Sequence, residues 1–309
     1  MTIKNAEPSK IKPVPAIRGK EFLSKLFGML KGCAACTLII LNLFILPTIV
    51  LISAFFMLII PIKAWKKYCL WFQQVYLPPY WADINNKILD FFTPVKWEVH
   101  GKGELNNNNW YFIICNHSSW ADILVLDKVF NRKIPKIKFF MKQELLWMLP
   151  ICGLACHIMG YPFIKRHRDR KGLMQDIETT KKISMSFKNS PTTIANFLEG
   201  TRFTLEKQQR EINSPYQNLL NPNPLMLALV AEALTGYLNQ VIDVTIVYSQ
   251  TPASIWSLLS GKIKKITVYY EVLPIDNDFR GNYVQDKDFR KRLQQRIKQI
   301  WLAKDQLLR

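Results

Sequence analysis

One of the chain's four histidines sits in a pattern that can do acid–base chemistry. His117 follows an apolar stretch that ends at Cys115, and Asp122 lies five residues after it. A histidine at the end of a buried strand lies where α/β folds usually bind ligands. An aspartate can hold the imidazole in one tautomer and stabilise its protonated form. The pair is therefore a candidate general base acting on a hydroxyl group.

The spacing restricts how these two side chains can meet. A step of five residues on a regular helix turns them about 140° apart, so they would not touch if both were helical. They can touch if His117 lies in a strand-to-helix turn and Asp122 in the first helical turn, with Ser118 or Ser119 as the helix cap. The chain contains no Gly-x-Ser-x-Gly nucleophile elbow. We therefore expect the substrate to supply the nucleophilic hydroxyl.

Two further segments have residue types suited to anions. Residues 160–166 end a strand candidate with two adjacent cations, and the Arg166 guanidinium can grip a phosphate through two parallel hydrogen bonds. Residues 199–202 follow another strand candidate, and the backbone around Gly200 can approach an oxyanion or phosphate closely. A solvated basic face is the alternative for the first segment, and an ordinary turn for the second.

A scaffold must bring these strand ends together, and the sequence from Val95 onward predicts one. Short runs rich in β-branched and aromatic residues predict strands at 96–100, 110–115, 157–164, 192–197, 241–248 and 265–273. Apolar residues at helical spacing predict helices at 170–187, 224–234 and 286–302. The alternation predicts an α/β fold with a mixed, mostly parallel central sheet flanked by helices. The apolar stripe of the last helix fits either the core or a lipid surface.

The N-terminal part carries a long apolar run without charges between Lys31 and Lys63, long enough to enter a bilayer. Pro47 lies at its middle, where it removes a helix hydrogen bond. Two half-helices turning at Pro47 would form a re-entrant helical hairpin, and a single tilted membrane helix is the alternative. Both flanks are basic, which mildly favours both ends on the cytoplasmic side. The aromatic-rich residues 63–94 suit either the water–lipid interface or packing on the globular part.

The charge balance limits the classes of molecule that the protein is expected to bind. The 42 Lys and Arg residues against 23 Asp and Glu give a net charge of +19, which favours anionic partners. No nucleic-acid-binding motif is evident, so we expect membrane lipids and no nucleic acid. The cysteines and histidines lack metal-site spacing, and we expect no metal and no disulfide. The expected organisation is a basic tail over 1–30, a membrane-embedded and interfacial segment over 31–94, and a catalytic domain over 95–309.

Together, the three polar segments resemble the motifs of the glycerophospholipid acyltransferase family, which includes the 1-acylglycerol-3-phosphate acyltransferases. The family's Asn-His-x4-Asp is present at 116–122, its Gly-x-x-Phe-Ile-x-Arg at 160–166 and its Glu-Gly-Thr-Arg at 199–202. A fourth motif, an apolar strand around Val-Pro-Val, is approximated at 242–246 without the proline. The extended third motif is most similar to the lysocardiolipin-acyltransferase-like branch and its bacterial membrane-bound members.

The resemblance implies transfer of a fatty acyl group from a thioester, acyl-CoA or acyl carrier protein, to a lysophospholipid hydroxyl without an acyl-enzyme. The acceptor it favours is 1-acylglycerol 3-phosphate, with lysophosphatidylglycerol, lysocardiolipin and lipid-to-lipid transacylation left open. It implies His117 as general base and Asp122 as its orienting partner. The substrate-binding residues it implies are Arg166, Glu199, Gly200, Thr201 and Arg202.

Within this set we expect the two arginines to bind the acceptor phosphate, and Glu199 to position Arg202 or the glycerol. Backbone amides near Gly200 are expected to stabilise the tetrahedral oxyanion. No cofactor beyond the acyl donor is expected. The implied location is a bacterial inner membrane, with the active site facing the cytoplasm.

Overall fold

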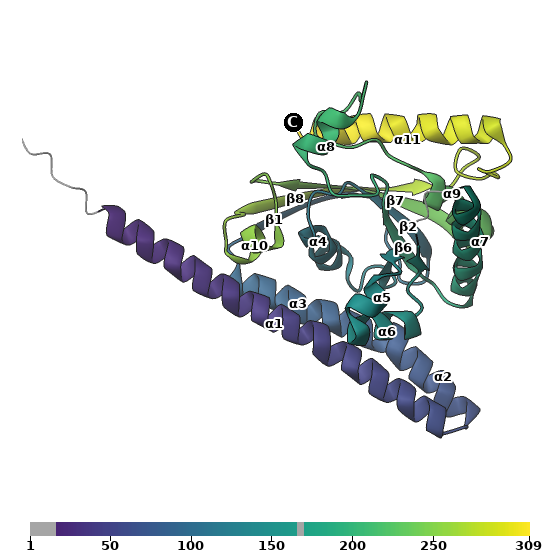
Figure 1. The fold of residues 1–309 in the computed structure, drawn as a ribbon, viewed down its shortest axis with the longest axis horizontal. Coiled ribbons are helices and arrows are strands. Elements are labelled where there is room, and N and C mark those ends of the chain that lie inside the picture. Colours follow the sequence, from purple (N-terminus) through teal and green to yellow (C-terminus); the bar gives the residue numbers. More distant parts are fainter. Residues whose placement is uncertain (1–16, 166–169) are drawn as a thin grey trace, which may run out of the picture.

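The computed structural model describes residues 17–165 and 170–309 (Figure 1). Within these residues the central sheet has six strands in the order β1-β8-β7-β2-β6-β3. Their bounds are β1 (Lys96–Lys102), β2 (Trp110–Cys115), β3 (Ile137–Phe139), β6 (Thr193–Phe197), β7 (Leu238–Tyr248) and β8 (Lys265–Pro274). Neighbouring strands are parallel except β7 with β8. The predicted mixed, mostly parallel α/β sheet is confirmed.

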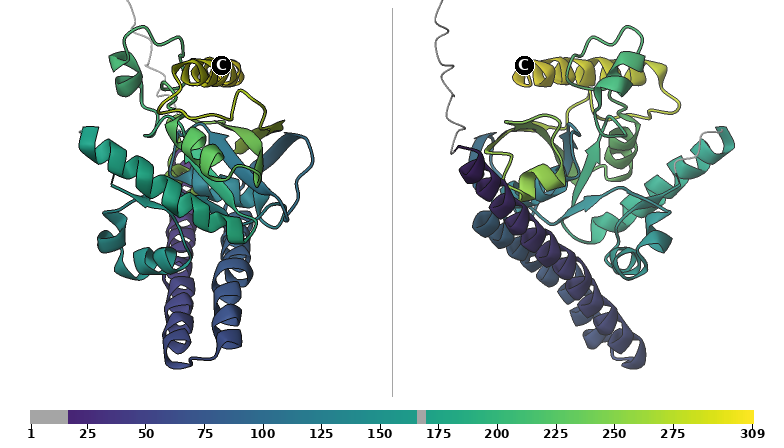
Figure 2. Two further views of the ribbon diagram at one scale, coloured as in Figure 1. Left: turned by 90° about the vertical axis from the view of Figure 1, so that its right-hand side faces the viewer. Right: turned by 60° about the vertical axis from the view of Figure 1, so that its left-hand side comes forward.

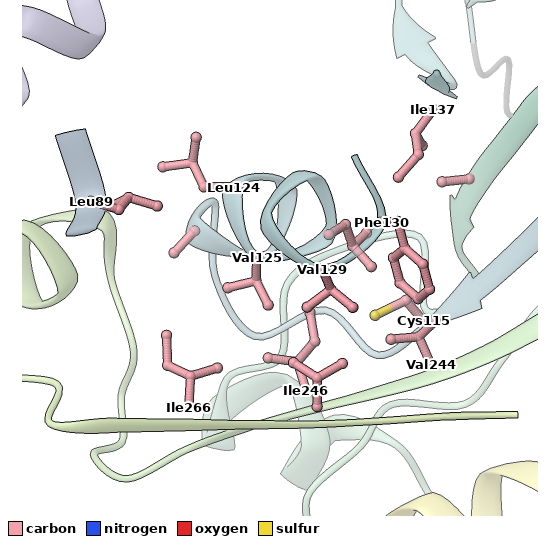
Figure 3. Close-up of a cluster of buried hydrophobic side chains, with 14 of the residues drawn as sticks. Leu89, Cys115, Leu124, Val125, Val129, Phe130, Ile137, Val244, Ile246 and Ile266 are labelled. Carbon is pink, nitrogen blue, oxygen red and sulfur yellow. The ribbon is translucent and has the colours of Figure 1, made fainter. Parts of the chain in front are cut away.

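Helices cover both faces of this sheet, which is why the central strand β2 is buried on both sides and is formed entirely by apolar and aromatic residues. In β2, Ile113 and Cys115 point to one face and Phe112 and Ile114 to the other. The first face packs against α4 in a core that also includes β7 and β8 side chains (Figure 3). The α-helices that follow β1 along the chain are α4 (Ala121–Phe130), α5 (Leu145–Met148), α6 (Pro150–Ile158), α7 (Arg170–Ser186), α8 (Leu205–Arg210), α9 (Leu225–Ala233), α10 (Ile255–Leu259) and α11 (Lys287–Leu307).

The last helix, α11, packs its apolar stripe into the second core. Phe289, Leu293, Ile297 and Trp301 are buried there with side chains of α9. Of the two interpretations of this stripe, core packing therefore holds. Near the end of α11 the buried ammonium of Lys304 donates to the Val244 carbonyl and pairs with Asp243, both on β7. These contacts fasten the C-terminus to the sheet.

One predicted strand is largely wrong, and two short strands were missed. The run at 157–164 begins inside α6, and only β5 (Phe163–Ile164) is extended. It pairs with β4 (Met141–Lys142) in a separate small sheet. Gly160 adopts φ 74°, a left-handed conformation that ends the helix and prevents a continuous strand. The edge strand β3 is too short to leave a pattern in the sequence.

The N-terminal helices form an antiparallel hairpin that projects from the sheet (Figure 2). Helix α1 (Ile17–Ile59) is continuous through Pro47, and the chain turns at residues 60–62. It returns through α2 (Lys63–Trp71), a π-helical turn (Phe72–Tyr76) and α3 (Leu77–Phe92). Of the two alternatives, a turn at Pro47 does not occur: the apolar run is one continuous helix, and the hairpin turns beyond its end. Of the tail predicted over 1–30, residues from Ile17 onward belong to α1, and the rest lie outside the described residues.

The reason that α1 tolerates Pro47 lies elsewhere in the chain. A proline cannot donate to the carbonyl four residues earlier, which here belongs to Leu43. That carbonyl accepts instead from the Cys152 thiol of α6, with Sγ 3.1 Å away. Across the hairpin, the Asn42 amide donates to Asn85 Oδ1 at 2.8 Å and to the Trp81 carbonyl at 3.1 Å. These polar contacts fix the register of α1 against α3 and α6.

Candidate active site

His117 and Asp122 meet at the C-terminal end of β2. The imidazole Nδ1 lies 2.8 Å from Asp122 Oδ2. His117 occupies the turn after the strand, and Asp122 is the second residue of α4, as their spacing predicts. The His117 residue is 9% exposed and Asp122 is fully buried, so the pair is shielded from bulk water on all but one side.

Asp122 is surrounded by donors. Its Oδ2 also accepts from the amides of Ser118 at 2.8 Å and Ser119 at 2.9 Å, and its Oδ1 accepts from the Tyr248 hydroxyl at 2.6 Å. These bonds and the N-terminus of α4 stabilise the ionised carboxylate. A carboxylate at Nδ1 places the proton of the neutral imidazole on that nitrogen. Nε2 then carries the lone pair that a general base needs.

Tyr248 was missed in the sequence analysis. Burial and the nearby Asp122 charge raise the pKa of the Tyr248 hydroxyl, which keeps it protonated and able to donate. Tyr248 is the last residue of β7, the strand that pairs with β2. Its place at a strand end near His117 is the feature of the sequence that could have identified it as a site residue. The predicted serine cap is wrong: Trp120 precedes α4 and makes no capping hydrogen bond with its side chain, and Ser119 Oγ accepts from the Ala121 amide at 3.1 Å.

The His117 turn is fixed to both neighbouring strands. Asn116 continues the β ladder with its side chain, donating to the Ile246 carbonyl at 3.0 Å and accepting from the Ile246 amide at 2.8 Å. On the other side, the Phe197 ring of β6 stacks on the imidazole, with centroids 3.9 Å apart and planes 12° from parallel. The imidazole is held in one orientation by a ring on its face and a carboxylate at its edge.

The Glu199 side chain also binds the His117 turn, through a backbone amide. Its carboxyl accepts from the backbone amide of His117 at 3.0 Å and from that of Leu220 at 3.0 Å. Burial raises the pKa of Glu199 to about 8, although the two amide bonds act in the opposite direction. We expected this side chain to position Arg202 or the glycerol. In the structure it binds backbone amides, one of them at His117.

The residues after Glu199 form the rim of the site. Gly200 adopts φ 68°, and its amide donates to the Phe197 carbonyl at 2.9 Å. Of the amides near Gly200 that we expected at the oxyanion, that of Gly200 itself is therefore engaged inside the turn. Arg202 is exposed, with its guanidinium carbon 5.3 Å from the centroid of the Trp120 ring. Thr201 Oγ1 accepts from Lys207 Nζ at 2.8 Å. Another predicted phosphate ligand, Arg166, lies outside the described residues.

A cavity of about 610 Å³ connects this rim to the hairpin. His117, Gly200, Thr201 and Arg202 line its polar end. The remaining wall is mostly apolar and comes from α1, α3, α4, α5, α6 and the strands β3, β4 and β6. Its members on the hairpin are Leu43, Leu46, Pro47, Val50, Leu77, Pro78 and Trp81. The His117 side chain therefore borders a space suited to a hydrocarbon chain.

The cavity wall also contains an ion pair that the sequence analysis did not single out. Lys136 Nζ lies 2.6 Å from Asp127 Oδ1, and both side chains are nearly buried. The Lys136 ammonium also lies 5.1 Å from the centroid of the Trp81 ring on α3. Pairing and the aromatic face compensate for removing these charges from water.

The comparisons with known proteins agree with this geometry. A family model described as Acyltransferase matches residues 96–249, which include the His117 turn and Glu199. The crystal structure of the 1-acyl-sn-glycerophosphate (LPA) acyltransferase PlsC from Thermotoga maritima is similar, with a TM-score of 0.53 and 16% identity over 92% of this chain and 98% of that one. At this identity the likeness is one of fold. The comparison with curated proteins gave no match. Residues 96–249 belong to the Acyltransferase family, and the chain is an acyltransferase.

Proposed function

We propose that the protein transfers a fatty acyl group from an acyl thioester to the free hydroxyl of 1-acylglycerol 3-phosphate, giving phosphatidic acid. The observation that carries this proposal is the His117–Asp122 pair at the end of a mostly apolar cavity. A base at that point can activate an alcohol beside the carbonyl of a chain that fills the cavity. The similar crystal structure is that of an LPA acyltransferase, which supports the acceptor.

In the proposed mechanism, His117 Nε2 takes the proton from the acceptor hydroxyl as its oxygen attacks the thioester carbonyl. Asp122 stabilises the imidazolium that forms. The tetrahedral intermediate then expels the thiolate, which receives the proton from the imidazolium, and the products are an ester and a free thiol. Base catalysis of this kind contributes about 10²–10⁴ in rate. We propose no metal or cofactor, because the thioester itself supplies the leaving group.

For the acceptor phosphate we propose Arg202 at the cavity rim, together with Arg166. A guanidinium can hold a phosphate through two parallel hydrogen bonds. The Trp120 ring next to Arg202 restricts the motion of the guanidinium, so binding a phosphate costs less entropy. Lysophosphatidylglycerol and lysocardiolipin carry phosphodiesters in place of this monoester, with anionic oxygens that a guanidinium can also bind, and are the alternative acceptors.

For the hairpin we propose insertion into a membrane. The segment Leu26–Ile59 is apolar enough to cross one, with a mean hydropathy of 2.6, and only 28% of its most apolar window is buried in the protein. Exposing so many apolar side chains to water is unfavourable, whereas a bilayer accommodates them. The net charge of +19 suits an anionic surface such as the cytoplasmic face of a bacterial inner membrane.

The direct test is acyl transfer by the detergent-solubilised protein. Palmitoyl and oleoyl groups would be offered on CoA and on acyl carrier protein, with lysophosphatidic acid, lysophosphatidylglycerol and lysocardiolipin as acceptors. His117→Ala should lose activity by at least about 10²-fold because the base is gone. His100→Ala is the matched control, since His100 lies on the edge strand β1 and stacks on Tyr269. More than a tenth of the activity remaining in His117→Ala would contradict the assignment.

A further inference from the structure

A second apolar surface lies beside the hairpin, on α5 and α6. Residues 145–164 contain no Asp, Glu, Lys or Arg. Trp147 is 77% exposed and Met148 is 71% exposed, and Leu149, Ile151 and Leu154 are also exposed. We call these five side chains the α5–α6 patch. The two helices are far too short to cross a bilayer, so the run differs in kind from α1.

The patch is attached rigidly to the hairpin. The thiol of Cys152 in α6 binds the Leu43 carbonyl of α1, and Ala155 packs with Leu46 and Val50 of α1. Helix α5 folds tightly onto α6 at Gly153, where a Cβ atom would lie 2.7 Å from Leu146 Cα. These contacts hold α5 and α6 at a fixed height along α1.

That height matches the edge of a bilayer. Helix α6 contacts α1 around Pro47, and α1 continues from there to Ile59 at the hairpin tip. This stretch rises by about 18 Å at about 1.5 Å per residue. One leaflet of hydrocarbon is about 15 Å thick. With the hairpin inclined so that Lys63, Lys66 and Lys67 after its tip reach the headgroups, the α5–α6 patch lies at the boundary between hydrocarbon and headgroups, where tryptophan is favoured.

Charge and cavity both fit this placement. Exposed lysines flank the patch, Lys142 on β4 and Lys165 just after β5, and the pairing of β4 with β5 holds the two flanks together. Lysines at this level match anionic phospholipid headgroups. Met148 belongs to the patch and also lines the cavity, so the cavity opens at this surface.

We propose that the α5–α6 patch is a second membrane contact, seated shallowly in an anionic phospholipid surface, and that it places the cavity mouth against the lipid. Exposed aromatic and aliphatic side chains with flanking lysines are the composition of interfacial segments. The hairpin inserts into the membrane, and the patch sets the orientation of the catalytic domain relative to the membrane surface. The proposal extends the proposed function, since it concerns how that enzyme meets lipid substrates.

The test compares two substrate formats in the full-length protein. Trp147→Glu should lower acyl transfer to lysophosphatidic acid in phosphatidylglycerol vesicles by about tenfold. It should leave the rate with a short-chain acyl-CoA and a short-chain lysolipid, both monomeric in water, within about twofold of wild type, because the base and cavity are untouched. Ile212→Glu is the matched control: Ile212 is 89% exposed and follows α8, on the other side of the sheet from α5 and α6 (Figure 1). Equal losses in both formats, or no loss in either, would overturn the proposal.

A binding measurement separates this proposal from the proposed function. The emission of Trp147 is obtained as the difference between wild type and Trp147→Phe, and it should be quenched by phosphatidylglycerol brominated near the headgroup end of its chains. An unquenched difference spectrum would overturn the membrane contact. If the wild-type protein transfers no acyl group in either format, the proposed function fails and quenching alone decides the contact. A dimer in detergent that Trp147→Glu converts to monomer would assign the patch to a second copy instead.

Discussion

At the scale of single residues, the position of the His117–Asp122 pair depends on side chains that contact it from several directions. Asn116, Phe197 and Glu199 each hold the His117 turn from a different direction, and Tyr248 holds Asp122. A positioning error of about 1 Å can cost 10²-fold in rate, so these contacts bear directly on activity. Two of them can be tested separately from the base itself.

Tyr248→Phe removes the hydroxyl that donates to Asp122 Oδ1 and leaves the ring. Without this hydrogen bond the Asp122 carboxylate is held less firmly against His117 Nδ1. We expect kcat to fall by about threefold to tenfold while KM stays within about twofold of wild type. Tyr269→Phe, on β8 beside His100, is the control. An unchanged kcat would assign Tyr248 a packing role only.

Glu199→Gln tests the buried carboxyl through stability. In the folded protein the pKa of Glu199 is raised to about 8, whereas an unfolded glutamate releases its proton near about pH 4.3. Between these values the folded state holds the extra proton, so the Glu199 contribution to the free energy of unfolding falls as pH rises, by up to about 1.4 kcal/mol per unit. The Gln variant should lose this slope in urea titrations at several pH values. Glu206→Gln, exposed on α8, should keep it, and equal slopes in both variants would contradict the assignment.

At the scale of elements, the hairpin and the catalytic domain share one cavity. Val50 of α1 is buried and lines its apolar part. Val50→Phe places a ring in that space, and we expect kcat/KM for a palmitoyl donor to fall by about tenfold relative to an octanoyl donor, since about 1.4 kcal/mol of burial is lost. Ile52→Phe, on the exposed face of the same helix, is the control. An unchanged ratio of the two donors would place the acyl chain elsewhere.

Which elements could be predicted follows from whether their signals are local. The α/β alternation and the meeting of His117 with Asp122 were predictable, because strand composition and helix geometry act over a few residues. Which of the two arrangements of the apolar run forms could not be predicted, because the hydrogen bond lost at Pro47 is compensated by Cys152, which is remote in sequence. The roles of Tyr248 and Glu199 depend on strand order and on a loop amide, which a single sequence does not reveal.

At the scale of the whole molecule, charge and apolar surface act together. The net charge of +19 should make binding to anionic vesicles weaken as salt rises, by at least about tenfold between 0.1 and 1 M. Vesicle flotation at several salt concentrations measures this. The apolar hairpin should leave a salt-resistant fraction bound, and neutral vesicles should show little salt dependence. Complete release at high salt would contradict insertion of the hairpin.

The shared cavity also limits how this enzyme can be engineered for solubility. Trimming the chain before β1 removes the most apolar surface and leaves His117, Asp122 and their supports in place. It also removes α1 and α3, and with them the walls formed by Leu46, Val50 and Trp81. A water-soluble fragment would keep His117 and Asp122 but lose the part of the cavity wall that we propose holds the acyl chain. Solubility is better sought by substituting polar residues for apolar ones on the outer faces of the hairpin and leaving the residues that line the cavity unchanged.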